Sequence, residues 1–289
     1  MLFTIDHTTE YRFTRPVFLE PHQLRLQPRT DGAQRLVRFD LQIEPTPAGM
    51  TLATDAEGNI VTMAWFNDVH DRMVLRSSSE VETLRENPYD FLLTPTNRRL
   101  PIGYQPWETT QLAAALKRVA VPIHVDPARE LAEQLRECAR GELVPFLVRL
   151  TETVCDRFKV IHRVKGGPWP PATTIEQRQG ACRDLAALFI DVCRSVGLAS
   201  RFVSGYQEGD ADQDKRYMHA WAEVYLPGAG WRGFDPTHGL AVADRHVAVA
   251  AAAGPQHATP VTATYRGNNV QAEMTADVAV ETSTAMVAC

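Results

Sequence analysis

Residues 180–194, GACRDLAALFIDVCR, and residues 219–236, HAWAEVYLPGAGWRGFDP, decide the fold of the chain. In the first stretch, apolar side chains recur at the spacing of one helix face, from Cys182 to Cys193. The second stretch alternates with period two around the turn sequence PGAG, which is typical of two antiparallel strands. Together the two stretches predict a helix that packs on an antiparallel sheet.

Cys182 lies at the predicted start of this helix, directly after Gly180 and Ala181. Unpaired backbone N–H groups and the positive end of the helix dipole stabilise a thiolate at such a position. A cysteine on an apolar helix face is more often a plain core residue, and Cys193 has that interpretation because it lies three turns further along. Cys182 differs because a histidine and an aspartate follow it on the predicted sheet.

His219 opens the first predicted strand of the sheet and Asp235 closes the second. A nucleophilic thiol needs a base, and the base needs an acceptor that orients it. The two residues share one face of the sheet only if Leu226 pairs with Gly230 across a three-residue turn, whereas pairing with Trp231 places them on opposite faces. The glycines around this turn favour the first register, so we predict that His219 and Asp235 lie side by side.

The pattern of apolar residues, turns and prolines on either side of these two stretches divides the chain into four parts. Period-two alternation and turn sequences predict an N-terminal β-sandwich over 1–85, and repeated prolines predict a linker over 86–126. Helical periodicity after Asp126-Pro127 opens a catalytic core over 127–245, with helices at 127–141 and 144–158 ahead of the Cys182 helix. Residues 246–289 are predicted to be strands that pack on the core or on the N-terminal domain. The fold class is therefore α+β.

Composition excludes several classes of function. The 289 residues carry 30 Lys+Arg against 35 Asp+Glu, a net charge of -5, so the chain lacks the basic excess that nucleic acid or an anionic membrane surface attracts. No apolar run approaches the length of a membrane span, and the N-terminus has no secretory pattern. The five cysteines are widely spaced without a CxxC pair, so we expect free thiols, no metal site and a cytoplasmic protein.

Three segments of the core, GACRDLAALFIDVCRSVGLASRFVSGYQ, HAWAEVYLPGAGWRGFDPTHG and DRHVAVA, resemble the bacterial transglutaminase-like superfamily, whose members are often described as cysteine proteases. The segment EYRF, with PV and HQLRLQPR after it, resembles the β-domain that precedes this core. The resemblance implies a papain-like fold and a catalytic triad. By this likeness Cys182 is the nucleophile, His219 the base and later the acid, and Asp235 the orienting carboxylate.

Further substrate-binding residues are predicted less directly. The backbone N–H of Cys182 is the natural first oxyanion donor. The candidates for a side-chain donor are Trp169, by likeness to transglutaminases, and Gln177 or Gln179, by likeness to papain-type enzymes. For each of them a surface or packing role is the equal alternative. Tyr206 is a candidate to line the cleft, with a structural role as the default. Trp221 is expected to shield the imidazole, although a strand tryptophan is more often a core residue. His238 and His246 lack the spacing of metal ligands, and no cofactor is predicted.

The predicted function is acyl transfer through a thioester. Cys182 attacks a peptide or carboxamide carbonyl, and water then resolves the thioester in a protease or amidase, whereas a primary amine resolves it in a transglutaminase. Hydrolysis is favoured because water is always present. An arylamine acetyltransferase fits less well, since no segment suggests a coenzyme A site. The alternative from another class is a non-catalytic module of the same fold that binds peptides. The expected partner is a peptide or protein substrate.

Overall fold

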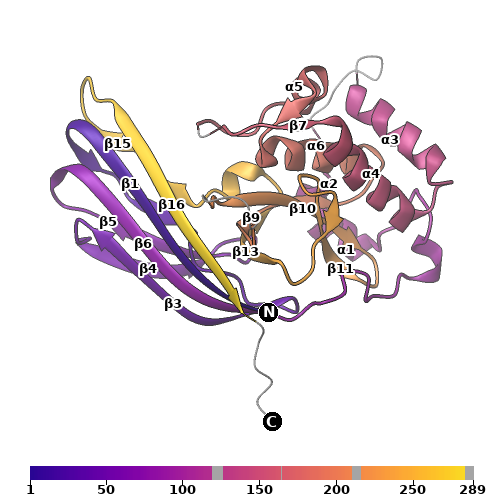
Figure 1. Cartoon of the computed structure of the whole chain (residues 1–289), viewed down its shortest axis with the longest axis horizontal. Helices are drawn as coiled ribbons and strands as arrows, with labels where there is room; N and C mark the ends of the chain where they lie inside the picture. The colour runs from indigo at the N-terminus through magenta and orange to yellow at the C-terminus, as the bar shows by residue number, and fades with distance from the viewer. Residues whose placement is uncertain (119–125, 164, 210–215, 284–289) are drawn as a thin grey trace, which may run out of the picture.

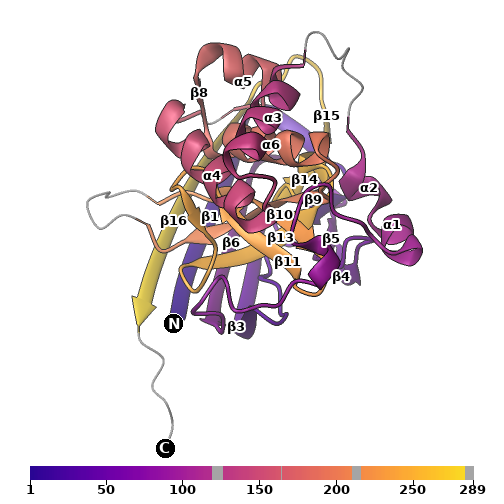
Figure 2. The same ribbon diagram turned by 90° about the vertical axis from the view of Figure 1, so that its right-hand side faces the viewer.

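The computed structural model describes residues 1–118, 126–163, 165–209 and 216–283. The chain forms an N-terminal part built of long strands and a second part in which helices cover a small sheet, as Figure 1 shows. Turning the molecule by 90° brings the helices to the front, with the long strands behind them (Figure 2). No helix of the described residues is both long and apolar enough to cross a membrane.

The N-terminal part consists of two antiparallel sheets that face each other. The first sheet has the order β15-β1-β6-β3, and β16 also pairs with β1. Its strands are β1 (Leu2–Leu19), β3 (Gln34–Glu44), β6 (Val69–Thr83), β15 (Tyr265–Arg266) and β16 (Ala272–Ser283). The second, in the order β14-β2-β5-β4, contains β2 (His22–Leu24), β4 (Gly49–Thr54), β5 (Ile60–Trp65) and β14 (Val261–Thr262).

An apolar layer between these two sheets holds them together. Val17 and Leu75 from the first sheet and Leu24 and Ala64 from the second are all buried in it. The alternation of buried and exposed residues along β1 and β6 is the period-two pattern visible in the sequence. The predicted sandwich is confirmed, and strands from the C-terminal range complete both of its sheets.

The range 86–126, predicted as a linker, contains short helices as well as extended chain. They are the 3₁₀ turn η1 (Pro95–Asn97) and the helices α1 (Pro106–Gln111) and α2 (Ala113–Leu116). Pro106 begins α1, where proline suits the first helical position, and the Glu108 side chain accepts a hydrogen bond from the Gln105 N–H at 2.8 Å. These helices are too short to give a recognisable apolar period.

The core places its helices against one five-stranded antiparallel sheet of order β12-β11-β10-β9-β13. The helices are α3 (Pro127–Cys138), α4 (Leu143–Arg157), α5 (Pro171–Gln177) and α6 (Cys182–Ser195). The sheet is made of β9 (Ser200–Gln207), β10 (His219–Leu226), β11 (Gly230–Asp235), β12 (Leu240–Ala241) and β13 (His246–Ala252). A short parallel pair, β7 (Lys159–Val160) and β8 (Gln179–Gly180), lies ahead of α6, and the 3₁₀ turn η3 (Pro255–His257) follows β13.

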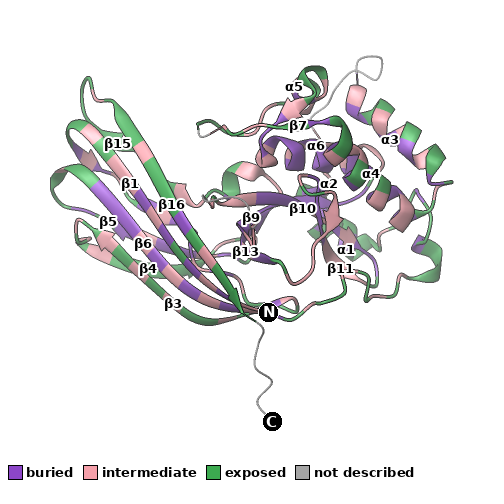
Figure 3. Cartoon of the chain, viewed as in Figure 1, coloured by how far each residue is buried: buried purple, intermediate pink, exposed green. Residues whose placement is uncertain are grey.

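Helix α6 is the centre of this core. Its apolar side chains, among them Leu185 and Phe189, are completely buried with Phe146 of α4 and Val224 of β10. Figure 3 shows the same distribution, with buried residues concentrated on α6 and on the sheet beside it. The range 246–289 divides between the two parts, because β13 joins the core sheet and the strands β14 to β16 join the N-terminal sheets.

Candidate active site

Cys182 is the first residue of α6, and its side chain is partly exposed. Glycine is required just before it, because a Cβ on Gly180 would lie 2.8 Å from the Cβ of Asp184. Burial acts against a charged sulfur, but the hydrogen bond and charge of His219, with the N–H of Ala220, lower the pKa of Cys182. The thiol is therefore activated by its position and by its neighbour.

His219 and Asp235 lie side by side on one face of the sheet. Leu226 pairs with Gly230, which confirms the predicted register of the hairpin. Asp235 is thereby diagonal to His219, and its Oδ2 accepts a hydrogen bond from Nε2 of His219 at 2.8 Å. Because Nε2 is used in this way, Nδ1 is the ring nitrogen left for the hydrogen bond with Cys182.

The charges of these three side chains support one another. Burial acts against a charged imidazole, but the charge and hydrogen bond of Asp235, together with those of Cys182, raise the pKa of His219 to about 10. Asp235 is completely buried, and its two histidine neighbours hold the pKa of its carboxyl far below the usual range despite that burial. At neutral pH the arrangement favours a thiolate beside an imidazolium beside a carboxylate.

Two family models match the chain. The model of the bacterial transglutaminase-like N-terminal region matches residues 3–82, and that of the transglutaminase-like superfamily matches residues 129–236, which include all three side chains just described. The chain belongs to the transglutaminase-like superfamily. The expected family is confirmed.

Relatives of this superfamily member cover most of its length. An uncharacterized protein of Mycobacterium tuberculosis is 29% identical over 264 residues, which are 86% of this chain and 82% of the relative. A protein-glutamine gamma-glutamyltransferase of Pseudomonas aeruginosa is 27% identical over 230 residues, which are 71% of this chain and only 30% of that protein. The crystal structure of a candidate cysteine protease from Cytophaga hutchinsonii superposes with a TM-score of 0.68 at 17% identity, covering 98% of this chain and 92% of that one. This last likeness shows that the two folds agree.

The other described cysteines of this transglutaminase-like chain differ from Cys182 in their surroundings. Cys193 is completely buried in the α6 core, and burial raises the pKa of its thiol. Burial also raises the pKa of Cys155, whose Sγ donates to the carbonyl oxygen of Thr237 at 3.5 Å. Cys138 is exposed at the end of α3. Cys289 lies outside the described residues.

Two of the predicted substrate-binding residues are buried away from any substrate. Tyr206 is 1% exposed in the contact between the two parts of the molecule, where its hydroxyl is 2.8 Å from Nδ1 of His7. Trp221 is also 1% exposed and packs beside the His219 ring with the ring centres 6.2 Å apart. The prediction that Tyr206 lines a cleft is wrong, and Trp221 contacts the histidine without reaching solvent. Sequence alternation shows which face a residue occupies but not which domain covers that face.

The three other predicted residues lie nearer the surface. Trp169 is partly exposed, and the Arg163 guanidinium stacks on its ring at 4.7 Å. Gln177 is exposed at the end of α5, and Gln179 is partly exposed in β8, opposite Lys159. No described contact joins the side chains of these residues to Cys182, so their roles as oxyanion donors stay predictions.

Asp184 organises the loop in front of the nucleophile. Its buried carboxylate accepts hydrogen bonds from the Ala181 N–H at 2.8 Å and the Trp169 N–H at 2.7 Å, and it pairs with Arg163 at 2.5 Å. Arg183 donates to the carbonyl oxygens of Arg163 and Lys165. These two residues fasten Arg163, Lys165 and Trp169 to the start of α6.

His246 is a member of the site that the sequence analysis does not assign. Its Nε2 lies 2.9 Å from Oδ2 of Asp235, the same oxygen that binds His219. In the sequence His246 starts the apolar strand VAVAAA and lies in the family-like segment DRHVAVA, but neither feature indicates a contact with Asp235.

Ligand atoms of His219, Asp235 and His238 lie within 4.8 Å of one another, which is close enough for a metal ion. However, Oδ2 of Asp235 already accepts from two histidines, and Oδ1 accepts the backbone N–H groups of Thr237 and His238 at 2.9 and 3.4 Å. An ion would have to displace these hydrogen bonds. The donor set fits a hydrogen-bonded carboxylate better than a metal site.

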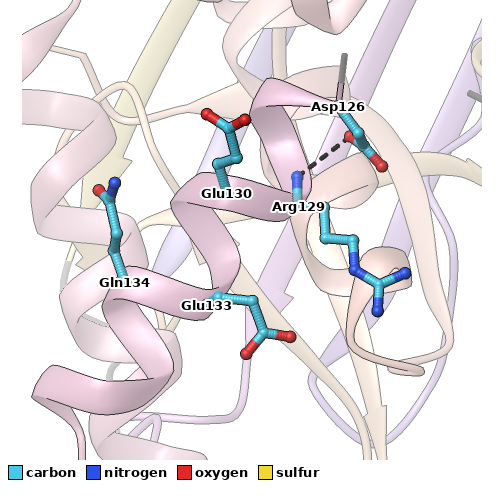
Figure 4. A pocket seen from close by; sticks show the side chains of 5 residues that line it. All are labelled: Asp126, Arg129, Glu130, Glu133 and Gln134. Carbon is cyan, nitrogen blue, oxygen red and sulfur yellow. Dashed lines mark hydrogen bonds between the residues drawn. The ribbon is translucent and has the colours of Figure 1, made fainter. Parts of the chain in front are cut away.

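Two hollows on the described surface lie along α3, away from Cys182. Figure 4 shows the first, lined by Asp126, Arg129, Glu130, Glu133 and Gln134. Asp126 accepts a hydrogen bond from the Arg129 N–H at 3.1 Å as the cap of the helix, and its carboxylate also pairs with Arg118. The second hollow extends toward Phe158 and Arg178. Capping and ion pairing give Asp126 a structural role at the first hollow, and the residues that line the two hollows do not include Cys182, His219 or Asp235.

Proposed function

We propose that this protein is a cysteine-dependent acyl-transfer enzyme that acts on a peptide or carboxamide bond of a peptide or protein. The single observation that supports this most directly is the chain of contacts from Cys182 through His219 to the buried Asp235. A thiolate that is partly exposed, an imidazolium that holds it and a carboxylate that orients the imidazolium are the groups that such a reaction needs.

In the first step Sγ of Cys182 attacks the carbonyl carbon and the oxygen becomes an oxyanion near the start of α6, where the N–H of Cys182 has no partner within the helix. The imidazolium of His219 gives its proton to the leaving nitrogen, so the C–N bond breaks and a thioester remains. His219, now neutral, takes a proton from water, and the hydroxide adds to the thioester. The products are a carboxylic acid and the free thiol.

Transfer to a primary amine is the second candidate, and the sequence similarity to the Pseudomonas aeruginosa gamma-glutamyltransferase favours it. In that case an amine, not water, attacks the thioester. We favour hydrolysis because water needs no specific acceptor site, whereas a primary amine does. The described cysteines are free thiols, and we place the reaction in a reducing compartment such as the cytoplasm.

The test is the alkylation of Cys182 by iodoacetamide from about pH 5 to about pH 9, with the modified peptide identified by mass. We expect Cys182 to react well below the ordinary thiol pKa and faster than Cys155 or Cys193. His219→Ala should remove the reaction at low pH, whereas His257→Ala, which changes an exposed histidine of η3, should leave it intact. Equal and slow labelling of all thiols would contradict the proposal and favour a module that only binds peptides.

A second experiment on the same protein distinguishes hydrolysis from transfer to a primary amine. A glutamine-containing peptide is incubated with and without a primary amine, and the acid and amide products are counted by mass. A predominance of acid even at high amine concentration supports hydrolysis. A predominance of the amide would show that the enzyme is a transglutaminase.

A further inference from the structure

His246 makes a contact that crosses the core sheet. It is the first residue of β13, whereas Asp235 is the last residue of β11, and the strands β10 and β9 lie between them in the sheet order. Even so, Nε2 of His246 is 2.9 Å from Oδ2 of Asp235. His246 is only 3% exposed, so this hydrogen bond is protected from solvent.

The contact is possible because a glycine occupies the strand between them. Gly205 of β9 pairs with His219 on one side and with Ala248 on the other. A Cβ on Gly205 would lie 2.1 Å from the carbonyl oxygen of Val247 and 2.7 Å from the Trp221 ring, so the backbone of β13 and the indole together cover the place that a side chain would take. The ring of His246 then meets Trp221 nearly at right angles, with the ring centres 5.1 Å apart. Trp221 is the packing surface that directs His246 toward Asp235.

The direction of the hydrogen bond follows from the chemistry of the two groups. An ionised carboxylate only accepts, so Nε2 of His246 carries the proton. Burial, against the opposing effect of Asp235, lowers the pKa of His246, which keeps the ring neutral. The other charged or titratable groups that act on this ring are His219 and Arg245, and both disfavour a second positive charge. Asp235 therefore holds one imidazolium and one neutral imidazole on the same oxygen.

The strand that carries His246 is fixed by the N-terminal sandwich. The side-chain amide of Gln34 donates to the carbonyl oxygen of Ala248 at 2.8 Å and accepts from its N–H at 2.7 Å. Asn59 makes the same pair of bonds to Ala251, at 2.9 and 2.8 Å. These amides occupy the free edge of β13, so the position of His246 depends on both parts of the molecule.

We infer that His246 is a positioning residue for the proposed reaction: its Nε2–H holds the Asp235 carboxylate in the orientation that fixes the His219 imidazolium beside Cys182. The inference rests on the proposed function. A carboxylate held at Oδ2 by two donors and at Oδ1 by backbone N–H groups cannot rotate away from His219. Without the donor from His246, the Asp235 carboxylate is freer to rotate, so it orients the His219 imidazolium less well.

Three variants separate the hydrogen bond from the packing. His246→Phe keeps a ring against Trp221 but removes the donor. His246→Gln keeps an N–H at a reach similar to that of Nε2, whereas His246→Asn is one carbon shorter and does not reach Asp235. For each variant the pH profile of Cys182 alkylation is measured on folded protein, together with kcat and KM once a substrate is found.

We expect His246→Phe and His246→Asn to alkylate at pH 6 about tenfold more slowly than the wild type, with the midpoint of the profile at higher pH. His246→Gln should recover most of the rate, and kcat should change more than KM. If His246→Phe does not fold, the alkylation rates of His246→Gln and His246→Asn are compared with each other, and this comparison tests the role of the hydrogen bond. A wild-type profile in His246→Asn, or equal loss in the Gln and Asn variants, would overturn the role of His246. Failure of the wild type to react at low pH would instead count against the proposed function.

Discussion

Cys182 and Cys193 lie on the same helix, and their surroundings give them opposite chemistry. Burial raises the pKa of Cys193, because the loss of water around the thiol outweighs the opposing effects of the Ser200 hydrogen bond and the Arg194 charge. The pKa of Cys182 is lowered because His219 and the N–H of Ala220 outweigh the same effect of burial. Residue type alone therefore does not identify a reactive thiol, whereas position at the helix start and a histidine partner do.

The first prediction concerns Asp235→Asn. Against the effect of burial, Asp235 and Cys182 together raise the pKa of His219 to about 10, with Asp235 the larger contributor, so activity that needs the imidazolium should persist up to that pH and fall above it. Without that charge, burial lowers the pKa of His219, and the alkaline limit of activity should move to lower pH. We expect kcat/KM at neutral pH to fall about 100-fold or more, measured with a peptide substrate across the pH range.

The control for this variant is Asp40→Asn, which removes the same charge from an exposed position on β3. Its pH profile should match that of the wild type. An unchanged alkaline limit in Asp235→Asn would show that the carboxylate does not set the protonation of His219.

Helix α6 and the hairpin of β10 and β11 are the elements that the sequence predicts best. The apolar period from Cys182 to Cys193 and the flanking glycines predict α6 well, and the register of the hairpin follows from requiring His219 and Asp235 on one face. Such signals are local, because they depend on residues that are neighbours along one helix or across one turn.

What the sequence does not indicate depends on contacts between distant elements. His246 reaches Asp235 because Gly205 has no side chain between them and because His246 packs against Trp221. The period-two pattern of a strand does not indicate a contact across two intervening strands. Tyr206 alternates as expected for a strand residue, but the face it occupies is covered by the N-terminal sandwich and not by substrate. The candidate triad could thus be predicted, and the buried surroundings that support it could not.

The second prediction concerns the start of α6. Asp184→Asn removes the charge that pairs with Arg163 and places an amide N–H beside the N–H groups of Ala181 and Trp169. Breaking a buried ion pair on one side leaves the other charge without compensation. We expect the free energy of unfolding to fall by about 3 kcal/mol, measured by urea denaturation.

Glu133→Gln is the matched variant for comparison. Glu133 pairs with Arg136 one turn along α3, and both side chains are about 40% exposed. Removing this exposed pair should change the free energy of unfolding by less than about 0.5 kcal/mol. Similar losses in the two variants would mean that the buried position of Asp184 has no special importance for stability.

At the scale of the whole molecule, the N-terminal sandwich and the core share the strand β13. Phe3 and Val81 of the sandwich are buried with Val247 of β13, and the side chains of Gln34 and Asn59 satisfy the backbone of its outer edge. An exposed edge strand would otherwise offer unpaired N–H and C=O groups to other chains. The sandwich therefore protects the sheet that carries the candidate active site.

The third prediction tests the contact between the sandwich and the outer edge of β13, and it compares two glutamines of strand β3. Gln34→Leu leaves the N–H of Ala248 buried without its partner, so the free energy of unfolding should fall by about 2 kcal/mol. Gln42→Leu, further along β3, alters an exposed side chain and should change it by less than about 0.5 kcal/mol. Urea denaturation of the two variants measures the difference, and an equal effect would contradict the importance of this edge.

The pairing of β16 with β1 also constrains the order of events when the protein is made. Strand β1 has β6 on one side and β16 on the other, in continuous register from Leu2–Ser283 to Phe13–Ala272. A ribosome delivers β1 first and β16 only after the entire core has been synthesised. One long edge of the first sheet therefore stays open until β16 has been synthesised, which happens only after the whole core has left the ribosome.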